Sequence, residues 1–130
     1  MSLSVITPVT VGAVAFGGAL GSVVRFVVGA AVPSWNGVPI ATLTVNVSGA
    51  LLIGALAKLF AGSVEPSMWR LALATGFCGG FTTFSALSLE VISLLQQGRV
   101  LRAAAYVLLT LVLGFAATWL GYTMAPSRYA

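Results

Sequence analysis

The sequence predicts an all-α integral membrane protein with four transmembrane helices. Of its 130 residues, 59% are hydrophobic and 6% are charged, and the mean hydropathy is +1.09. A soluble domain carries about 25% charged residues, so this chain has too few to cover its surface in water. The composition therefore excludes both a free-standing soluble fold and a disordered chain.

Four apolar stretches are each long enough to cross a bilayer. They cover residues 5–32, 40–60, 68–95 and 101–124. A helix needs about 20 residues to span a hydrocarbon core of about 30 Å. The stretches are continuous and lack the period-two alternation of a membrane β-barrel, which predicts helices. We expect a single transmembrane domain over residues 1–130.

The first span, residues 5–32, could be mistaken for a signal peptide. It has no basic segment before it and is too long for the apolar part of a signal, so we expect it in the mature protein. Gly17, Gly21, Arg25 and Gly29 recur at every fourth position and share one face. The Gly17 and Gly21 pair permits close packing of helices. Arg25 either extends to the membrane interface or lines the mouth of an anion pathway.

The second span, residues 40–60, contains an asparagine among small hydroxyl residues. Thr42, Thr44 and Ser48 accompany Asn46. An amide in hydrocarbon costs several kcal/mol unless it is hydrogen-bonded. Two interpretations of Asn46 follow: it clasps a neighbouring helix, or it donates to a permeating anion.

The third span is unusual because its middle, residues 76–85, reads GFCGGFTTFS. Gly79 and Gly80 weaken a helix, and the hydroxyl side chains after them compete for backbone hydrogen bonds. We therefore predict that this helix is broken at mid-membrane. Such a break persists only where protein or a polar cavity surrounds it, and in transporters it commonly binds an ion. A simple kink is the alternative.

The third span also carries an aromatic stripe and one acid. Phe77, Phe81 and Phe84 lie at i, i+4 and i+7. This stripe either packs against other helices or turns its slightly positive ring edges towards an anion. Glu90 is the only acid inside a span. It either pairs with an arginine or faces a vestibule.

The fourth span, residues 101–124, has a stripe of polar and small residues. The stripe repeats at every fourth position and comprises Tyr106, Thr110, Gly114, Thr118 and Tyr122. A track of hydroxyls beside a pore and ordinary hydrogen bonding between helices both explain it.

The basic residues give no preferred orientation. Four spans place the N-terminus, the second connection and the C-terminus on one side of the membrane. The two sides carry three basic residues each, Lys58, Arg70 and Arg128 against Arg25, Arg99 and Arg102. Either other features set the topology, or the chain inserts both ways and forms an antiparallel dual-topology dimer. Four short helices also build a pathway more easily at a subunit interface.

Several classes of function are excluded by the residues that are missing. The chain has no histidine, and its single cysteine, Cys78, lies in an apolar run. A disulfide framework, a cysteine-rich metal site and an acid–base catalytic group are therefore not expected, and we predict that the chain is not an enzyme. The basic residues do not cluster, so we expect no nucleic acid partner.

Three stretches together resemble a known family. They are GGALGSVVR at residues 17–25, TLTVN at residues 42–46 and GFCGGFTTFS at residues 76–85. Over its whole length the chain resembles the Fluc, or CrcB, fluoride channels. The resemblance implies a homodimer with two antiparallel pores in the cytoplasmic membrane. Such channels pass fluoride passively, exclude chloride and relieve fluoride toxicity.

The resemblance also implies site residues. A structural sodium ion at the dimer centre would be held by the backbone carbonyls of Gly79 and Thr82. The matching fluoride-pathway residues are Asn46, Phe84, Leu87, Ser85, Thr42, Tyr106, Thr110, Arg25 and Glu90.

Two positions depart from the family pattern. Leu87 stands where a second pore phenylalanine is expected, and Gly114 stands where a hydroxyl is common. These departures keep open a heterodimer in which one pore is degenerate.

Two other classes of function share part of this pattern. A small multidrug-resistance-like, proton-coupled exporter also has four short spans, but it needs an acid in the middle of its first span, and none is present here. A non-transporting assembly or lipid-binding subunit would leave the polar third span unexplained.

Overall fold

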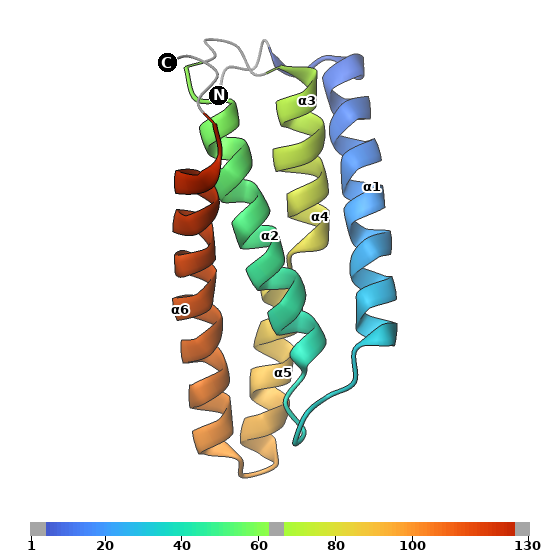
Figure 1. Ribbon diagram of the computed structural model, residues 1–130. Helices are drawn as coiled ribbons and strands as arrows, with labels where there is room; N and C mark the ends of the chain where they lie inside the picture. Colours follow the sequence, from blue (N-terminus) through green and yellow to red (C-terminus); the bar gives the residue numbers. More distant parts are fainter. Residues whose placement is uncertain (1–4, 63–66, 127–130) are drawn as a thin grey trace.

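The computed structural model describes residues 5–62 and 67–126, and these form an all-helical bundle (Figure 1). The described part has four helical spans long and apolar enough to cross a membrane, Pro8–Ala31, Ile40–Leu59, Met68–Gln96 and Val100–Met124. They agree closely with the spans predicted from hydropathy. Arg128 and residues 63–66 of the second connection lie outside the described residues.

Helix α1, Pro8–Ala31, begins at a cap that the sequence encodes locally. The backbone N–H of Thr10 donates to Thr7 Oγ1 at 3.2 Å, and the backbone N–H of Thr7 donates to Thr10 Oγ1 at 2.9 Å. Pro8 occupies the first turn, where its missing N–H costs nothing. After α1 the chain reverses in a tight turn, where Asn36 (φ 51°) and Gly37 (φ 77°) are both left-handed.

The third span consists of several segments. It contains α3, Met68–Arg70, then the π-helical segment η2, Leu71–Cys78, then α4, Gly79–Phe81, and α5, Phe84–Gln96. Between α4 and α5, Thr82 and Thr83 are extended, with ψ of 155° and 117°. The two preceding glycines are themselves helical. The extended residues are thus the threonines that follow Gly79 and Gly80.

Spans that follow one another along the chain run antiparallel, whereas the two main packing pairs consist of helices that run parallel (Figure 1). Helix α1 lies against η2 and α4, whereas α2, Ile40–Leu59, lies against α6, Val100–Met124. A Cβ added to Gly17 would collide with the Ala72 carbonyl, and one added to Gly21 would collide with the Phe77 carbonyl. The predicted packing role of this glycine pair is therefore confirmed.

A compact buried cluster joins α5 to α6, while much of the outer surface is apolar. The cluster consists of Leu87, Leu94, Ala103 and Tyr106. Large apolar side chains such as Phe26 and Phe115 are each 75% exposed. An exposed surface of this kind suits contact with lipid, where a helix satisfies its backbone hydrogen bonds internally.

Candidate functional site

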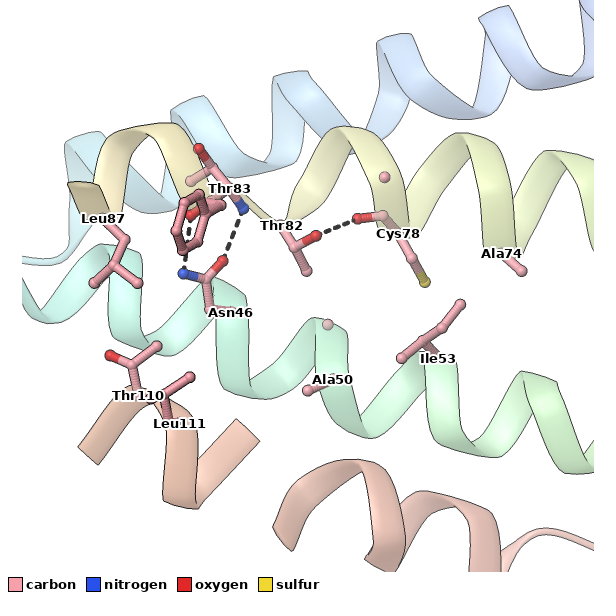
Figure 2. Close-up of a pocket in the computed structure, with 13 residues that line it drawn as sticks. Asn46, Ala50, Ile53, Ala74, Cys78, Thr82, Thr83, Leu87, Thr110 and Leu111 are labelled. Atoms are coloured by element: carbon pink, nitrogen blue, oxygen red, sulfur yellow. Dashed lines mark hydrogen bonds between the residues drawn. The ribbon is translucent and has the colours of Figure 1, made fainter. Parts of the chain in front are cut away.

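The amide of Asn46 on α2 clasps the extended backbone of the third span (Figure 2). Asn46 Nδ2 donates to the Thr83 carbonyl at 3.1 Å, and the Thr83 N–H donates to Asn46 Oδ1 at 2.8 Å. Of the two interpretations of Asn46, the structure therefore shows the interhelical clasp. The clasp uses one of the two N–H groups of the amide.

Thr83 itself starts the next helix. Its hydroxyl accepts a hydrogen bond from the Ala86 N–H at 3.1 Å, as expected for an N-cap threonine. The same hydroxyl lies 3.2 Å from that of Ser85. One residue before it, the Thr82 hydroxyl donates to the Cys78 carbonyl at 2.9 Å. The interruption is thus held by side chains on both sides.

A cavity of about 480 Å³ lies beside this clasp (Figure 2). It brings together six of the residues that were predicted for the pathway or the sodium site: Asn46, Gly79, Thr82, Phe84, Leu87 and Thr110. No residue in its lining carries a formal charge. The cavity is therefore mostly apolar with a few hydrogen-bonding groups, the usual composition of a site for a small ligand.

Phe84 and Leu87 are neighbours along α5 with opposite environments. Phe84 is 79% exposed, so its ring lies on the open surface of the single chain. Leu87 is 6% exposed and belongs to the buried cluster between α5 and α6. Since Leu87 also lines the cavity, one side chain serves both packing and the cavity wall.

Glu90 is held by two hydroxyls, one on each carboxylate oxygen. Thr42 Oγ1 donates to Oε1 at 2.7 Å, and the Tyr106 hydroxyl donates to Oε2 at 2.6 Å. These three residues form a second polar group, which we call the Glu90 cluster. The pairing with an arginine, one of the two options left by the sequence, is not found among the residues that the structure describes.

Arg25 is directed to the interruption of the third span. Its Nε donates to the Gly80 carbonyl at 3.0 Å, and the Ser22 hydroxyl approaches the same carbonyl at 3.4 Å. A positive charge next to the last carbonyls of a helical segment is electrostatically favourable. Arg25 also lines a small cavity of about 90 Å³ with Thr42 and Thr83.

The polar stripe of α6 is not uniform. Thr110 and Thr118 donate to carbonyls of their own helix, at 2.8 and 3.0 Å. Tyr106 is 1% exposed and bonds to another helix, while Tyr122 is 40% exposed and lies under the Lys58 ammonium. Bonding between helices therefore explains Tyr106 but not the threonines.

The aromatic stripe of the third span is also divided. The rings of Phe77 and Phe81 stack on each other with centroids 5.5 Å apart. The packing interpretation therefore holds for these two rings, and Phe84 lies apart at the cavity.

Sequence reasoning missed the central position of Thr83. It contacts Asn46 and Ser85, and it lines both cavities. A threonine just before an apolar helical run is a recognisable N-cap, and that signal was available at residues 83–86.

Comparison with known proteins gives consistent matches over most of the chain. The family model described as CrcB-like protein, Camphor Resistance (CrcB), matches residues 12–122. A protein of Gloeobacter violaceus named fluoride-specific ion channel FluC is 47% identical over 115 residues, covering 85% of this chain and 91% of the relative. The protein of the same name from Klebsiella pneumoniae is 46% identical over 123 residues, covering 89% and 95%.

These relatives are named as ion channels, which are not enzymes. The matches extend over all four apolar spans, and they agree with the resemblance found in the glycine, asparagine and threonine–phenylalanine stretches. The chain is therefore a multi-pass membrane protein that belongs to the CrcB family.

Proposed function

We propose that the chain is a fluoride-selective channel that passes F⁻ passively across the cytoplasmic membrane and thereby relieves fluoride toxicity. The observation that carries this proposal is the similarity to proteins named fluoride-specific ion channels, at 47% identity over 85% of the chain for one of them. The cavity beside the third-span interruption contains groups that could solvate a fluoride ion.

Fluoride is small and strongly hydrated, so a pore must replace its water with hydrogen-bond donors. The cavity offers the remaining N–H of Asn46 and the ring edge of Phe84. Because no charged residue lines this cavity, an anion would be solvated there without being trapped. Arg25, near the interruption, raises the local concentration of anions.

We further propose that the channel is an antiparallel dual-topology homodimer with two pores. The third-span interruption would then lie at mid-membrane, where the two copies meet. The exposed ring of Phe84 supports this, because a second copy would cover it and close the cavity on that side. The equal numbers of basic residues on the two sides support insertion in both directions.

A sodium ion at the dimer centre would be held by the carbonyls of Gly79 and Thr82, and the local geometry fits it. In a continuous helix the Thr83 N–H would bond to the Gly79 carbonyl, but here it donates to Asn46. Gly79 is exposed, and open space surrounds the position of its absent side chain. Carbonyls at such interruptions commonly bind cations. When bound, sodium would neutralise carbonyl dipoles of both copies.

Two alternatives are tested by the same experiment. The chain would be one subunit of a heterodimer if Leu87 and Gly114 made its own pore inactive. It would be a proton-coupled exporter if its only intramembrane acid, Glu90, exchanged protons. The names of the relatives favour the channel over the exporter.

The experiment is fluoride efflux from liposomes that contain only the purified protein, with a parallel chloride measurement. We expect rapid fluoride loss without chloride loss. Fluoride efflux only after co-expression with a related chain would support the heterodimer. Absence of efflux in both cases, from a correctly folded protein, would contradict the channel.

A further inference from the structure

The contact between Asn46 and Thr83 carries an inference beyond the lining of a pathway. We propose that Asn46 is a positioning residue, whose amide fixes the Thr83 backbone so that α5 begins at Phe84 and presents this ring to the cavity. The inference rests on the proposed fluoride channel for its consequence, but the contact itself can be tested without fluoride.

Extended backbone inside a bundle leaves polar groups that need partners. Thr83 is 9% exposed, so its N–H and carbonyl are shielded from water. An unpaired backbone group in such surroundings is costly. Asn46 satisfies both groups with one planar amide, through hydrogen bonds of 2.8 and 3.1 Å.

Few other side chains could make this contact. Aspartate would accept from the Thr83 N–H but would repel its carbonyl, and leucine would do neither. Glutamine carries the same two groups on a longer stem, so it would displace the backbone that it holds. The structure therefore requires an asparagine at position 46 for a hydrogen-bonding reason that is independent of any anion.

Helix α2 approaches the interruption closely on the face that carries Asn46. A Cβ added to Gly49 would collide with the Thr82 methyl group and press on the Phe81 ring. Gly49 thus permits the approach, and Asn46, one turn earlier, makes the bond. These are two independent features of α2 directed at the same interruption.

The clasp acts on the pathway through the start of α5. Thr83 caps α5 through the Ala86 N–H, so its backbone position determines where the helix begins. Phe84 is the first residue of that helix, and Leu87 follows one turn later on the cavity wall. Releasing Thr83 would move the residues that line the cavity without removing any of them.

The first test measures the Thr83 backbone amide directly by NMR hydrogen exchange in the purified full-length protein. We expect N46L to accelerate exchange at Thr83 at least tenfold, and N46D to accelerate it less because its carboxylate still accepts. The matched control is S48A on the same helix, whose hydroxyl bonds only to its own helix. Unchanged exchange in N46L would overturn the proposal.

The second test replaces the Thr83 amide by an ester, using the α-hydroxy analogue of threonine. This removes the N–H that donates to Asn46 Oδ1 and leaves every side chain unchanged. We expect the ester to lower fluoride efflux at least tenfold and to lower the ratio of fluoride to chloride efflux. Loss of folded protein alone would lower the rate and leave that ratio unchanged.

The ester combined with N46L distinguishes positioning from direct binding of the anion. If Asn46 acts through Thr83, the double variant is no worse than N46L alone. Fluoride efflux at the wild-type rate in the ester variant would overturn the proposal. The proposal would also be overturned if the fold losses of efflux caused by the ester and by N46L multiplied in the double variant. A wild-type protein without fluoride efflux would contradict the proposed channel, and hydrogen exchange would still decide the clasp.

Discussion

The Tyr106 hydroxyl on α6 donates to Glu90 Oε2 on α5 at 2.6 Å, and it does so from a side chain that is 1% exposed. The other carboxylate oxygen accepts from Thr42 on α2, so three helices meet at one acid. A buried polar group of this kind stabilises a bundle when all its members have partners and destabilises it when one is removed.

The first prediction concerns this hydroxyl. Y106F leaves Oε2 of Glu90 without its donor, so we expect a loss of about 1–3 kcal/mol in the free energy of unfolding. Thermal unfolding in detergent measures it. Y122F is the control, because Tyr122 is 40% exposed near the opposite end of the same helix. Equal effects of the two variants would contradict a specific role for the Glu90 cluster.

The second prediction concerns the close contact between α1 and the third span. G21V places a side chain where the Phe77 carbonyl lies, so the helices must separate. We expect a destabilisation of about 1–3 kcal/mol or more, typical of overpacking. The control G12A adds a methyl group to open space on the same helix and should not destabilise the protein, because alanine favours a helix more than glycine does. If the two variants unfolded at the same temperature, Gly21 would not be required for the contact between α1 and the third span.

The third prediction concerns Leu87, at the position where the family resemblance predicts a second pore phenylalanine. One side of Leu87 belongs to the buried cluster, and the other faces the cavity. A phenyl ring can extend into that space, so we expect L87F to preserve or raise fluoride efflux. Efflux and gel filtration are measured together. Loss of the dimer in L87F would place Leu87 in packing alone.

Much of this fold was predictable because hydropathy and helix length are properties of the sequence. The four spans and the packing role of Gly17 and Gly21 follow from composition and spacing. The partners of Asn46 and Glu90 could not be predicted, since the groups that they bind lie 37 and up to 48 residues away along the chain. An amide or a carboxylate in an apolar span predicts that a hydrogen-bond partner exists. Only the folded structure identifies that partner.

The fourth prediction separates the charge of Arg25 from its hydrogen bond. Nε of Arg25 donates to the Gly80 carbonyl at 3.0 Å, at the end of α4. Lysine keeps the charge but lacks the planar group that makes this bond. Because R25K keeps the charge, we expect it to retain more fluoride efflux than R25A, while both variants lose about 1.5–3 kcal/mol of stability. Full efflux in R25K would mean that the charge alone is sufficient.

The fifth prediction concerns sodium. If the carbonyls of Gly79 and Thr82 from two copies hold one sodium ion, the ion binds the dimer and not the separate chains. By mass action, the dimer then dissociates more readily when sodium is removed. The difference in dimer stability is larger when the reference sample contains more sodium.

Purification in N-methyl-glucamine instead of sodium tests this, with the monomer–dimer equilibrium measured in detergent at several protein concentrations. Without sodium, we expect the midpoint of dimer dissociation to move to a higher protein concentration. Restoring sodium should move this midpoint back. A potassium series is the control for ionic strength. A dimer of equal affinity in all three salts would count against the central site and would leave the Asn46 clasp unaffected, because the clasp lies within one chain.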